Sequence, residues 1–85
     1  MSEYDSMPKY KLEIVLFAGY NDAGEPQVFK RIEGESPFIE EGNAVIAMLI
    51  MVREHRERYG HLKDFSIEAK VTDENGRLIG VYDDN

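Results

Sequence analysis

Two histidines and an aspartate come closest to a catalytic or metal-binding set in this chain. His55 and His61 are separated by a helix end, Asp64 follows shortly after, and Glu54 precedes His55. Imidazoles and carboxylates are common zinc ligands, but this spacing matches no standard ligand motif. A small metal-dependent enzyme that uses His55, His61 and Asp64 is therefore the least favoured of three functional hypotheses, and the other two are given at the end of this subsection. The favoured interpretation places His55 at the margin of the core or in an interface, and His61 in a helix cap or loop.

The other residue types that could perform chemistry are not arranged for it. The chain has no cysteine, so it has neither a thiolate nucleophile nor a disulfide framework. No serine lies in a nucleophile elbow, and no glycine pattern matches a phosphate-binding or dinucleotide-binding loop. The carboxylate pairs Glu40–Glu41 and Asp83–Asp84 are sequential and typical of solvated charge. The sequence therefore predicts no catalytic residue, no metal and no cofactor.

The charge balance favours a protein as the partner. The 85 residues carry 17 acids against 10 bases, which gives a net charge of −7. This excess of acid disfavours direct binding to nucleic acid or to an anionic membrane. It suits a partner with basic groups. The densest acidic neighbourhood is formed by four glutamates, which we predict to be the partner-binding residues: Glu33, Glu35, Glu40 and Glu41.

The length and composition predict one small folded domain. Apolar residues make up 42% of the chain and aromatic residues 11%, which is typical of a folded protein. The first residues lack the apolar segment of a signal peptide, and the longest apolar run, 44–52, is too short to span a bilayer. With the absence of cysteine, these features are compatible with a cytoplasmic location, which is our expectation.

The chain is organised around one long helical pattern, from Ser36 to Gly60. Ser36 followed by Pro37 is typical of an N-cap and first helical position. Gly60 is suited to a left-handed C-cap. Gly42 is unfavourable inside a helix, so the helix could also begin later or bend there. The sequence predicts this helix as the element against which the rest of the chain packs.

The first half of this helix is apolar on every side. The segment 44–52 contains no polar residue, although a helix on a sheet usually has one apolar face. Extending the phase from the charged second half predicts that Val45, Met48 and Val52 face the sheet. Ile46 and Ile50 then point away from it, with Ala47 and Met51 at the edge. Either the chain itself buries this side, or a partner does. We favour a second copy of the chain, and predict self-association through Ile46, Ile50, Met51 and Ala47.

Four strand patterns flank the helix as two hairpins. Their predicted ranges are 9–20, 27–33, 62–72 and 77–82, with tight turns at 21–25 and 73–76. The first strand is apolar on both sides in its far half, which predicts a central or covered strand. Alternation places Val28 with Ile32 and Phe29 with Arg31 on the second strand, a predicted edge strand with a bulge. On the fourth strand, alternation places Leu78 with Tyr82 and Ile79 with Val81, and Gly80 indicates a bulge or a close approach to the helix.

The predicted fold class is therefore α+β. The order is ββαββ, with a four-stranded, mainly antiparallel sheet and one long helix packed on one face. The strand order cannot be read from the sequence. The predicted organisation is a flexible N-terminal arm at residues 1–8, a single domain at 9–82 and an acidic tail at 83–85.

The leading functional hypothesis is a small acidic, non-enzymatic binding protein. It would form a homodimer and occlude a site on a larger partner, which could itself bind nucleic acid. Small acidic α+β proteins without cysteine are common among phage-encoded inhibitors, including anti-CRISPR proteins, but this is an analogy of class alone. The alternative is a structural or accessory subunit of a larger assembly, with its helix covered by a different chain.

Overall fold

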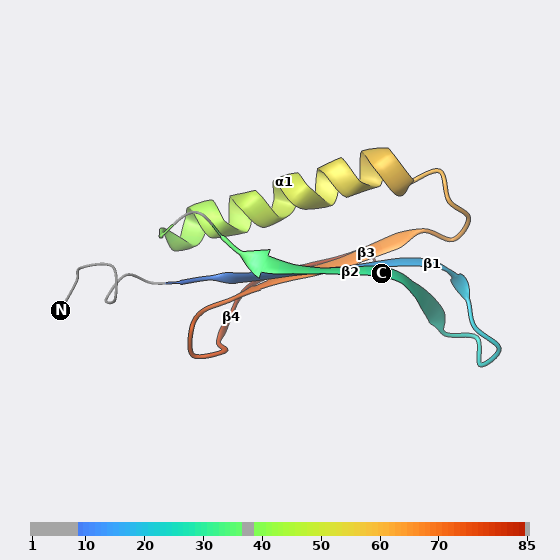
Figure 1. The fold of residues 1–85 in the computed structure, drawn as a ribbon, viewed down its shortest axis with the longest axis horizontal. Helices are drawn as coiled ribbons and strands as arrows, with labels where there is room; N and C mark the ends of the chain where they lie inside the picture. The colour runs from blue at the N-terminus through green and yellow to red at the C-terminus, as the bar shows by residue number, and fades with distance from the viewer. Residues whose placement is uncertain (1–8, 37–38, 85) are drawn as a thin grey trace.

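A computed structural model describes residues 9–36 and 39–84 of the protein. The predicted α+β class and ββαββ order are confirmed, and the four strands form one antiparallel sheet with the order β2-β1-β3-β4. Figure 1 shows the single helix lying along one face of this sheet. We call the opposite face the open face. The elements are β1 (Lys11–Tyr20), β2 (Pro26–Glu35), α1 (Glu41–Tyr59), β3 (Ser66–Thr72) and β4 (Leu78–Asp83).

The position of β1 inside the sheet explains its composition. β1 pairs with β2 on one side and with β3 on the other. Ile14 and Leu16 are fully buried beneath the helix, and Val15, which points to the open face, is only 6% exposed. A central strand has neighbours on both sides that shield its side chains, so it can be apolar on both faces. The prediction of a central strand is confirmed.

The core lies between α1 and the inner strands. The helix contributes Ala44, Met48 and Val52, one residue per turn along the stripe that faces the sheet. Val45 packs beside this stripe, as do His55 and Tyr59, which are partly buried. The core is completed by Tyr10, just before β1, and by six strand residues: Leu12, Ile14, Leu16, Ile67, Ala69 and Val71. The predicted inward stripe of the helix is therefore confirmed at Met48 and Val52.

The helix begins later than predicted. Ser36 does not cap it, because the Ser36 N–H donates to the Tyr10 carbonyl at 2.8 Å and so extends the ladder between β1 and β2. Helical geometry starts at Glu41, after Glu40 as the N-cap residue, and no side chain caps the helix there. The predicted first helical residue, Pro37, lies outside the described residues. The N-cap prediction was wrong. The local sequence favours Ser36 as a cap, but Ser36 pairs instead with Tyr10, which is distant in the sequence.

The helix end also differs from the prediction. Gly60 has φ −61° and ψ −14°, which is right-handed, and its N–H donates to the Arg56 carbonyl at 2.8 Å. The left-handed C-cap assigned to Gly60 is therefore wrong. The Leu62 N–H continues the turn by donating to Tyr59. In the turn after the helix, the left-handed conformation occurs at Asp64, with φ 55°, which is the single non-glycine residue at positive φ in the described ranges.

Bulges in both edge strands reverse the predicted faces of several side chains. On β2 the register shifts so that Val28 pairs with Phe17, which places Val28 on the open face. Phe29 instead packs edge-on against Tyr59 of α1, with ring centroids 5.2 Å apart. The predicted bulge and edge position of β2 are confirmed. The pairing of Val28 with Ile32 on one face was wrong, because one extra residue reverses the alternation beyond it.

The same effect occurs on β4. Val71 pairs with Gly80, but the next residue of β3, Thr72, pairs with Leu78. Leu78 therefore lies on the open face with Val81, while Tyr82 lies on the helix side. The predicted grouping of Leu78 with Tyr82 was wrong for the same physical reason as on β2.

Gly80 is where the helix approaches the sheet most closely among the described glycines. A Cβ atom placed on Gly80 would lie 3.0 Å from Cγ2 of Val45. Contacts this short force atoms to move in a packed interior. The predicted close approach at Gly80 is confirmed, and the bulge next to it shows that both suggestions for this glycine hold.

Replacing Gly80 with valine should destabilise the protein by about 1–3 kcal/mol, because the added side chain overpacks the site against Val45. Chemical denaturation would measure the change in the free energy of unfolding. Val45→Ala makes room at the same contact. The double variant should therefore be more stable than the sum of the two single changes predicts. Strict additivity of Gly80→Val and Val45→Ala would contradict the contact.

Candidate protein-interaction site

Three large aliphatic side chains are exposed on the outer face of α1. Ile46 is 53% exposed, Leu49 is 44% exposed and Ile50 is 49% exposed. We call these three residues the helix ridge. Their spacing of three and four positions places them along one side of the helix, and the buried stripe at Met48 and Val52 faces the other way. The predicted exposure of Ile46 and Ile50 is confirmed, and Leu49 joins them on this side of the helix.

The other two residues assigned to self-association lie elsewhere on the helix. Ala47 and Met51 are partly buried and pack against the core cluster. Helical phase places both on the flank of α1 between the buried stripe and the ridge. An incoming protein could reach their outer edges, but most of their contact area is already used within the fold. The structure thus brings Ile46 and Ile50 together on the surface and leaves Ala47 and Met51 largely inside.

The four glutamates assigned to a basic partner are divided between two layers. Glu33 and Glu35 alternate with Gly34 at the end of β2 and lie on the open face, where Glu33 is opposite Glu13 of β1. Glu40 and Glu41 lie at the start of α1, and Glu40 accepts a hydrogen bond from the Asn43 side chain at 3.2 Å. The sequence did not associate Glu13 with this group. Glu13 lies beside Glu33 only because β1 pairs with β2, and the alternation of residues within one strand does not reveal how two strands pair.

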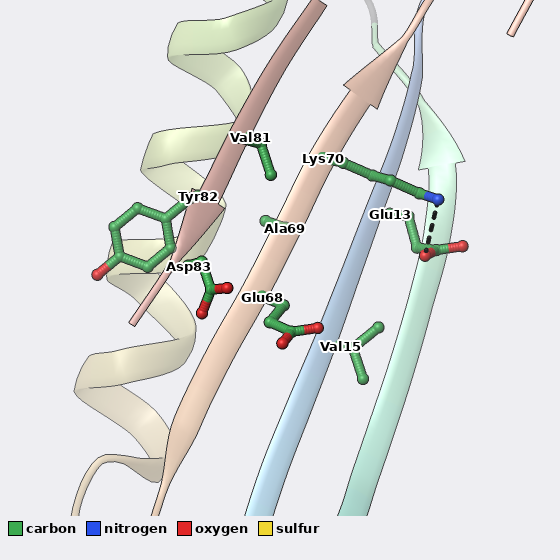
Figure 2. A pocket seen from close by; sticks show the side chains of 8 residues that line it. All are labelled: Glu13, Val15, Glu68, Ala69, Lys70, Val81, Tyr82 and Asp83. Carbon is green, nitrogen blue, oxygen red and sulfur yellow. Dashed lines mark ion pairs between the residues drawn. The ribbon is translucent and has the colours of Figure 1, made fainter. Parts of the chain in front are cut away.

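Glu13 is the centre of the charge pattern on the open face. One of its carboxylate oxygens lies 3.6 Å from a guanidinium nitrogen of Arg31 and 3.6 Å from Nζ of Lys70. Figure 2 shows Lys70 reaching across the sheet to Glu13. Because these groups are substantially exposed, each pair stabilises the fold only slightly. Their main consequence is to fix where positive and negative charge lie on this face.

A shallow hollow of about 220 Å³ opens next to this cluster. Val15 and Val81 belong to its apolar part, and Figure 2 shows Glu68 and Asp83 next to each other between them. Tyr82 turns away toward the helix side. The polar groups of the hollow are carboxylates and the Lys70 ammonium, and it contains no hydroxyl, thiol or imidazole aimed at a common point.

The histidines do not assemble into a metal centre in the described part of the chain. The Nδ1 atom of His55 lies 2.7 Å from the Met51 carbonyl oxygen, so Nδ1 must carry a proton and donate. The ring also stacks near Tyr59, with centroids 6.3 Å apart. His61 is exposed in the turn after α1. Residues 9–36 and 39–84 contain no group of three or more histidine, cysteine, aspartate or glutamate side chains that could hold a metal ion.

One polar cluster, around Asp84, was not predicted from the sequence. Asp84 accepts a hydrogen bond from the Ile67 backbone N–H at 2.8 Å and another from the Tyr82 hydroxyl at 2.7 Å, and it pairs with Arg56. Arg56 also donates to the Tyr82 hydroxyl at 2.7 Å. We call Arg56, Tyr82 and Asp84 the C-terminal clasp. It ties β4 to α1 and to the start of β3, whereas the sequence suggested only a solvated acidic tail.

No helix in the described residues combines the length and the apolar character needed to cross a membrane. No family model, no curated protein and no solved structure matches the chain. The interpretation of function therefore depends on the surface geometry of the protein itself.

Proposed function

We propose that the protein is a non-enzymatic protein-binding module, and that the helix ridge is its contact surface. The observation that carries the proposal is the exposure of about half of each ridge side chain, Ile46, Leu49 and Ile50, on the side away from the core. Contiguous apolar groups on a surface usually mark an interaction site. Side chains spaced by three and four residues are also those with which a helix enters an apolar groove.

The charges around the ridge indicate which charges a groove on the partner protein would carry. Glu40 and Glu41 lie at the N-terminal end of α1, where the helix dipole is positive and the glutamates reverse the sign of the surface. At the other end Arg53 and Glu57 pair with each other at 3.8 Å and so present no net charge. With the net charge of −7, this arrangement favours an apolar groove with basic side chains at the end that receives the start of the helix.

By occupying such a groove, the module would block whatever the partner binds there. This is the action of an inhibitor or regulator. The compositional analogy with phage-encoded inhibitors, including those of the anti-CRISPR type, favours this form of the proposal as an analogy of class. An accessory subunit of a larger assembly would use the same ridge for a permanent contact, and this is the alternative.

The sequence pattern assigned the ridge to a second copy of the chain. We now propose a different protein as its occupant, for two reasons. Ala47 and Met51, which would have widened the contact between two helices, are largely used by the core. In addition, β2 is an edge strand of the sheet, and an edge strand can pair with a second copy without using the helix.

A matched pair of variants tests the ridge. Ile50→Asp and Val81→Asp both add a carboxylate to an exposed aliphatic position, at 49% and 65% exposure. However, Ile50 lies on the ridge and Val81 on the open face. Wild-type protein and each variant would be immobilised and exposed to extract of the source cells. We expect the captured protein to bind Ile50→Asp at least about tenfold more weakly, as for a central interface residue, and Val81→Asp as well as wild type. Equal capture by wild type and Ile50→Asp would contradict the proposal.

A further inference from the structure

The outer edge of β2 carries backbone groups that are not used within the sheet. The Ser36 N–H donates to the Tyr10 carbonyl, and the register continues through the pairs Leu12–Gly34 and Ile14–Ile32. In an antiparallel ladder, residues alternate between those whose backbone groups point to the neighbouring strand and those whose groups point away. The even-numbered residues from 30 to 36 therefore face β1. The N–H and C=O groups of Arg31, Glu33 and Glu35 point outward from the sheet.

Only the second half of β2 is suited to pairing with another strand. The first half contains Pro26, the bulge beside Phe17 and the exposed Lys30, and these are features with which proteins protect free edges. From Lys30 to Glu35 the register with β1 is regular, and every residue except Ile32 is exposed. A partner strand can therefore pair along 30–34 but not along the whole of β2.

The outward-pointing backbone groups of β2 and its charged side chains together favour one register for the pairing of two copies of β2. Two antiparallel copies of β2 can share hydrogen bonds only if outward residues are opposite outward residues. A register centred on Ile32 satisfies this requirement, because it places Arg31 opposite Glu33 of the second copy, and the reverse. Registers centred on Arg31 or Glu33 would instead place two identical charges opposite each other, which is unfavourable.

The side chains on both faces fit the register centred on Ile32. Ile32, partly buried at present, would pack against Ile32 of the second copy in the closely spaced, non-hydrogen-bonded position. Lys30 would lie opposite Gly34, where even an added Cβ atom would meet no other atom within 4 Å. On the open face, Arg31 would lie between Glu13 of its own chain, now 3.6 Å away, and Glu33 of the second copy. Glu33 makes no ion pair within the described residues, so this contact would supply one.

We infer that a second copy of this chain joins at the β2 edge, antiparallel and centred on Ile32, so that one sheet continues through both copies. The two contacts between Arg31 and Glu33 are identical by symmetry, as an isologous dimer requires. The short pairing and the negative charge of each copy indicate a dimer that dissociates on dilution. This inference does not depend on what the helix ridge binds, since the ridge lies on the outer face of α1.

Charge reversal tests the register with a predicted rescue. Arg31→Glu would place glutamate opposite Glu33, and Glu33→Arg would place arginine opposite Arg31, so each variant alone should associate about tenfold or more weakly. An equimolar mixture of the two variants places opposite charges together at both contacts. It should therefore restore the dimer, as should the double variant that carries both changes. Light scattering after size exclusion, from micromolar to millimolar protein at fixed salt, measures the mass.

Matched controls make the same charge changes away from the edge. Glu74→Arg and Arg77→Glu lie in the turn between β3 and β4, where both residues are exposed, and they should leave the mass equal to that of wild type. Rescue in the mixture also shows that both single variants are folded. A wild-type protein that stays monomeric throughout, single variants that dimerise like wild type, or a mixture that stays monomeric would each overturn the inference. Because capture by the ridge is measured separately with Ile50→Asp, failure of one proposal leaves the other standing.

Discussion

Replacing Met48 with alanine is expected to be among the most destabilising changes in α1. Met48 is 1% exposed and lies in the middle of the buried stripe between helix and sheet. Removing most of a buried side chain loses its transfer free energy and leaves a cavity, which together cost about 2–5 kcal/mol. Domains of this size have only about 5–15 kcal/mol of stability in total. The midpoint of thermal unfolding should therefore fall by about 4–8 °C for each kcal/mol lost.

The control for this prediction is on the same helix. Ile50→Ala, two positions further along, removes a comparable side chain that is 49% exposed and should cost much less than Met48→Ala, because little burial is lost there. Urea denaturation of both variants at low protein concentration would measure the two free energies. Similar losses for Met48→Ala and Ile50→Ala would mean that the outer face of the helix is covered in the free protein, and the ridge would not be an exposed surface.

The second large effect is expected at the C-terminal clasp. Asp84→Asn removes the charge that pairs with Arg56 while keeping an oxygen that can accept from the Ile67 N–H. The Asp84 side chain is 17% exposed but that of Arg56 is 43% exposed, so water screens part of the interaction. Hydrogen bonds to charged groups contribute about 1.5–3 kcal/mol. Because water screens part of this interaction, we expect a loss of about 1–2 kcal/mol in the free energy of unfolding at neutral pH.

The pH dependence of this loss is predicted by the pKa of Asp84. Burial raises this pKa, but hydrogen bonds from Tyr82, from the Ile67 N–H and from Arg56, with the charge of Arg56, lower it more, so the pKa lies below its ordinary value. A carboxyl with a lowered pKa in the folded state stabilises the fold above its unfolded pKa, about 3.9 for aspartate. That stabilisation is lost as the pH falls through the lowered folded pKa.

The pKa values of the other two members of the clasp, Arg56 and Tyr82, are both raised. Burial lowers the pKa of Arg56, but the hydrogen bond and charge of Asp84 raise it more. The pKa of Tyr82 is raised, first by its hydrogen bond to Asp84 and then by burial. Both groups therefore keep their protons across the acidic and neutral range. Asp84 is the member of the clasp whose titration changes stability when the pH falls.

Urea denaturation of wild type and Asp84→Asn from neutral to acidic pH would test this dependence. The difference between the two proteins should be constant above about pH 5 and should shrink below about pH 4, as Asp84 in the wild type takes up a proton. Asp22→Asn, at an exposed residue of the turn between β1 and β2, is the matched control for the loss of one acid. A difference at Asp84 that is independent of pH would show that the carboxylate charge does not hold the clasp.

The predictable parts of the fold were those that depend on local pattern. Apolar and polar residues alternate along β3, and its apolar residues Ile67, Ala69 and Val71 are buried. The turn residues Asp73 and Gly76 close the hairpin as expected. The Asp73 side chain accepts from two backbone N–H groups, and Gly76 has φ 84°. The phase of the charged half of α1 also predicted the exposure of Ile46 and Ile50, but not that of Leu49. In each case, neighbouring residues decided the conformation.

The parts that failed were decided by contacts between distant segments. Ser36 extends a strand because Tyr10 offers a carbonyl to it, which no local pattern around Ser36 contains. Single extra residues on β2 and β4 moved Val28 and Leu78 to the open face. Asp84 reaches Arg56 across the layer between sheet and helix. The same limit applies to the interaction site, because the free edge of β2 exists only once the strand order is known.

The two proposals together give the protein separate binding surfaces: an apolar ridge for another protein and a sheet edge for a second copy. The solution mass of Ile50→Asp, compared with wild type at the same concentrations and salt, distinguishes these surfaces in one experiment. We predict that Ile50→Asp dimerises as wild type does, because Ile50 lies on the outer face of α1 and away from β2. A monomeric Ile50→Asp beside a dimeric wild type would refute this separation, and would return the second copy to the helix ridge.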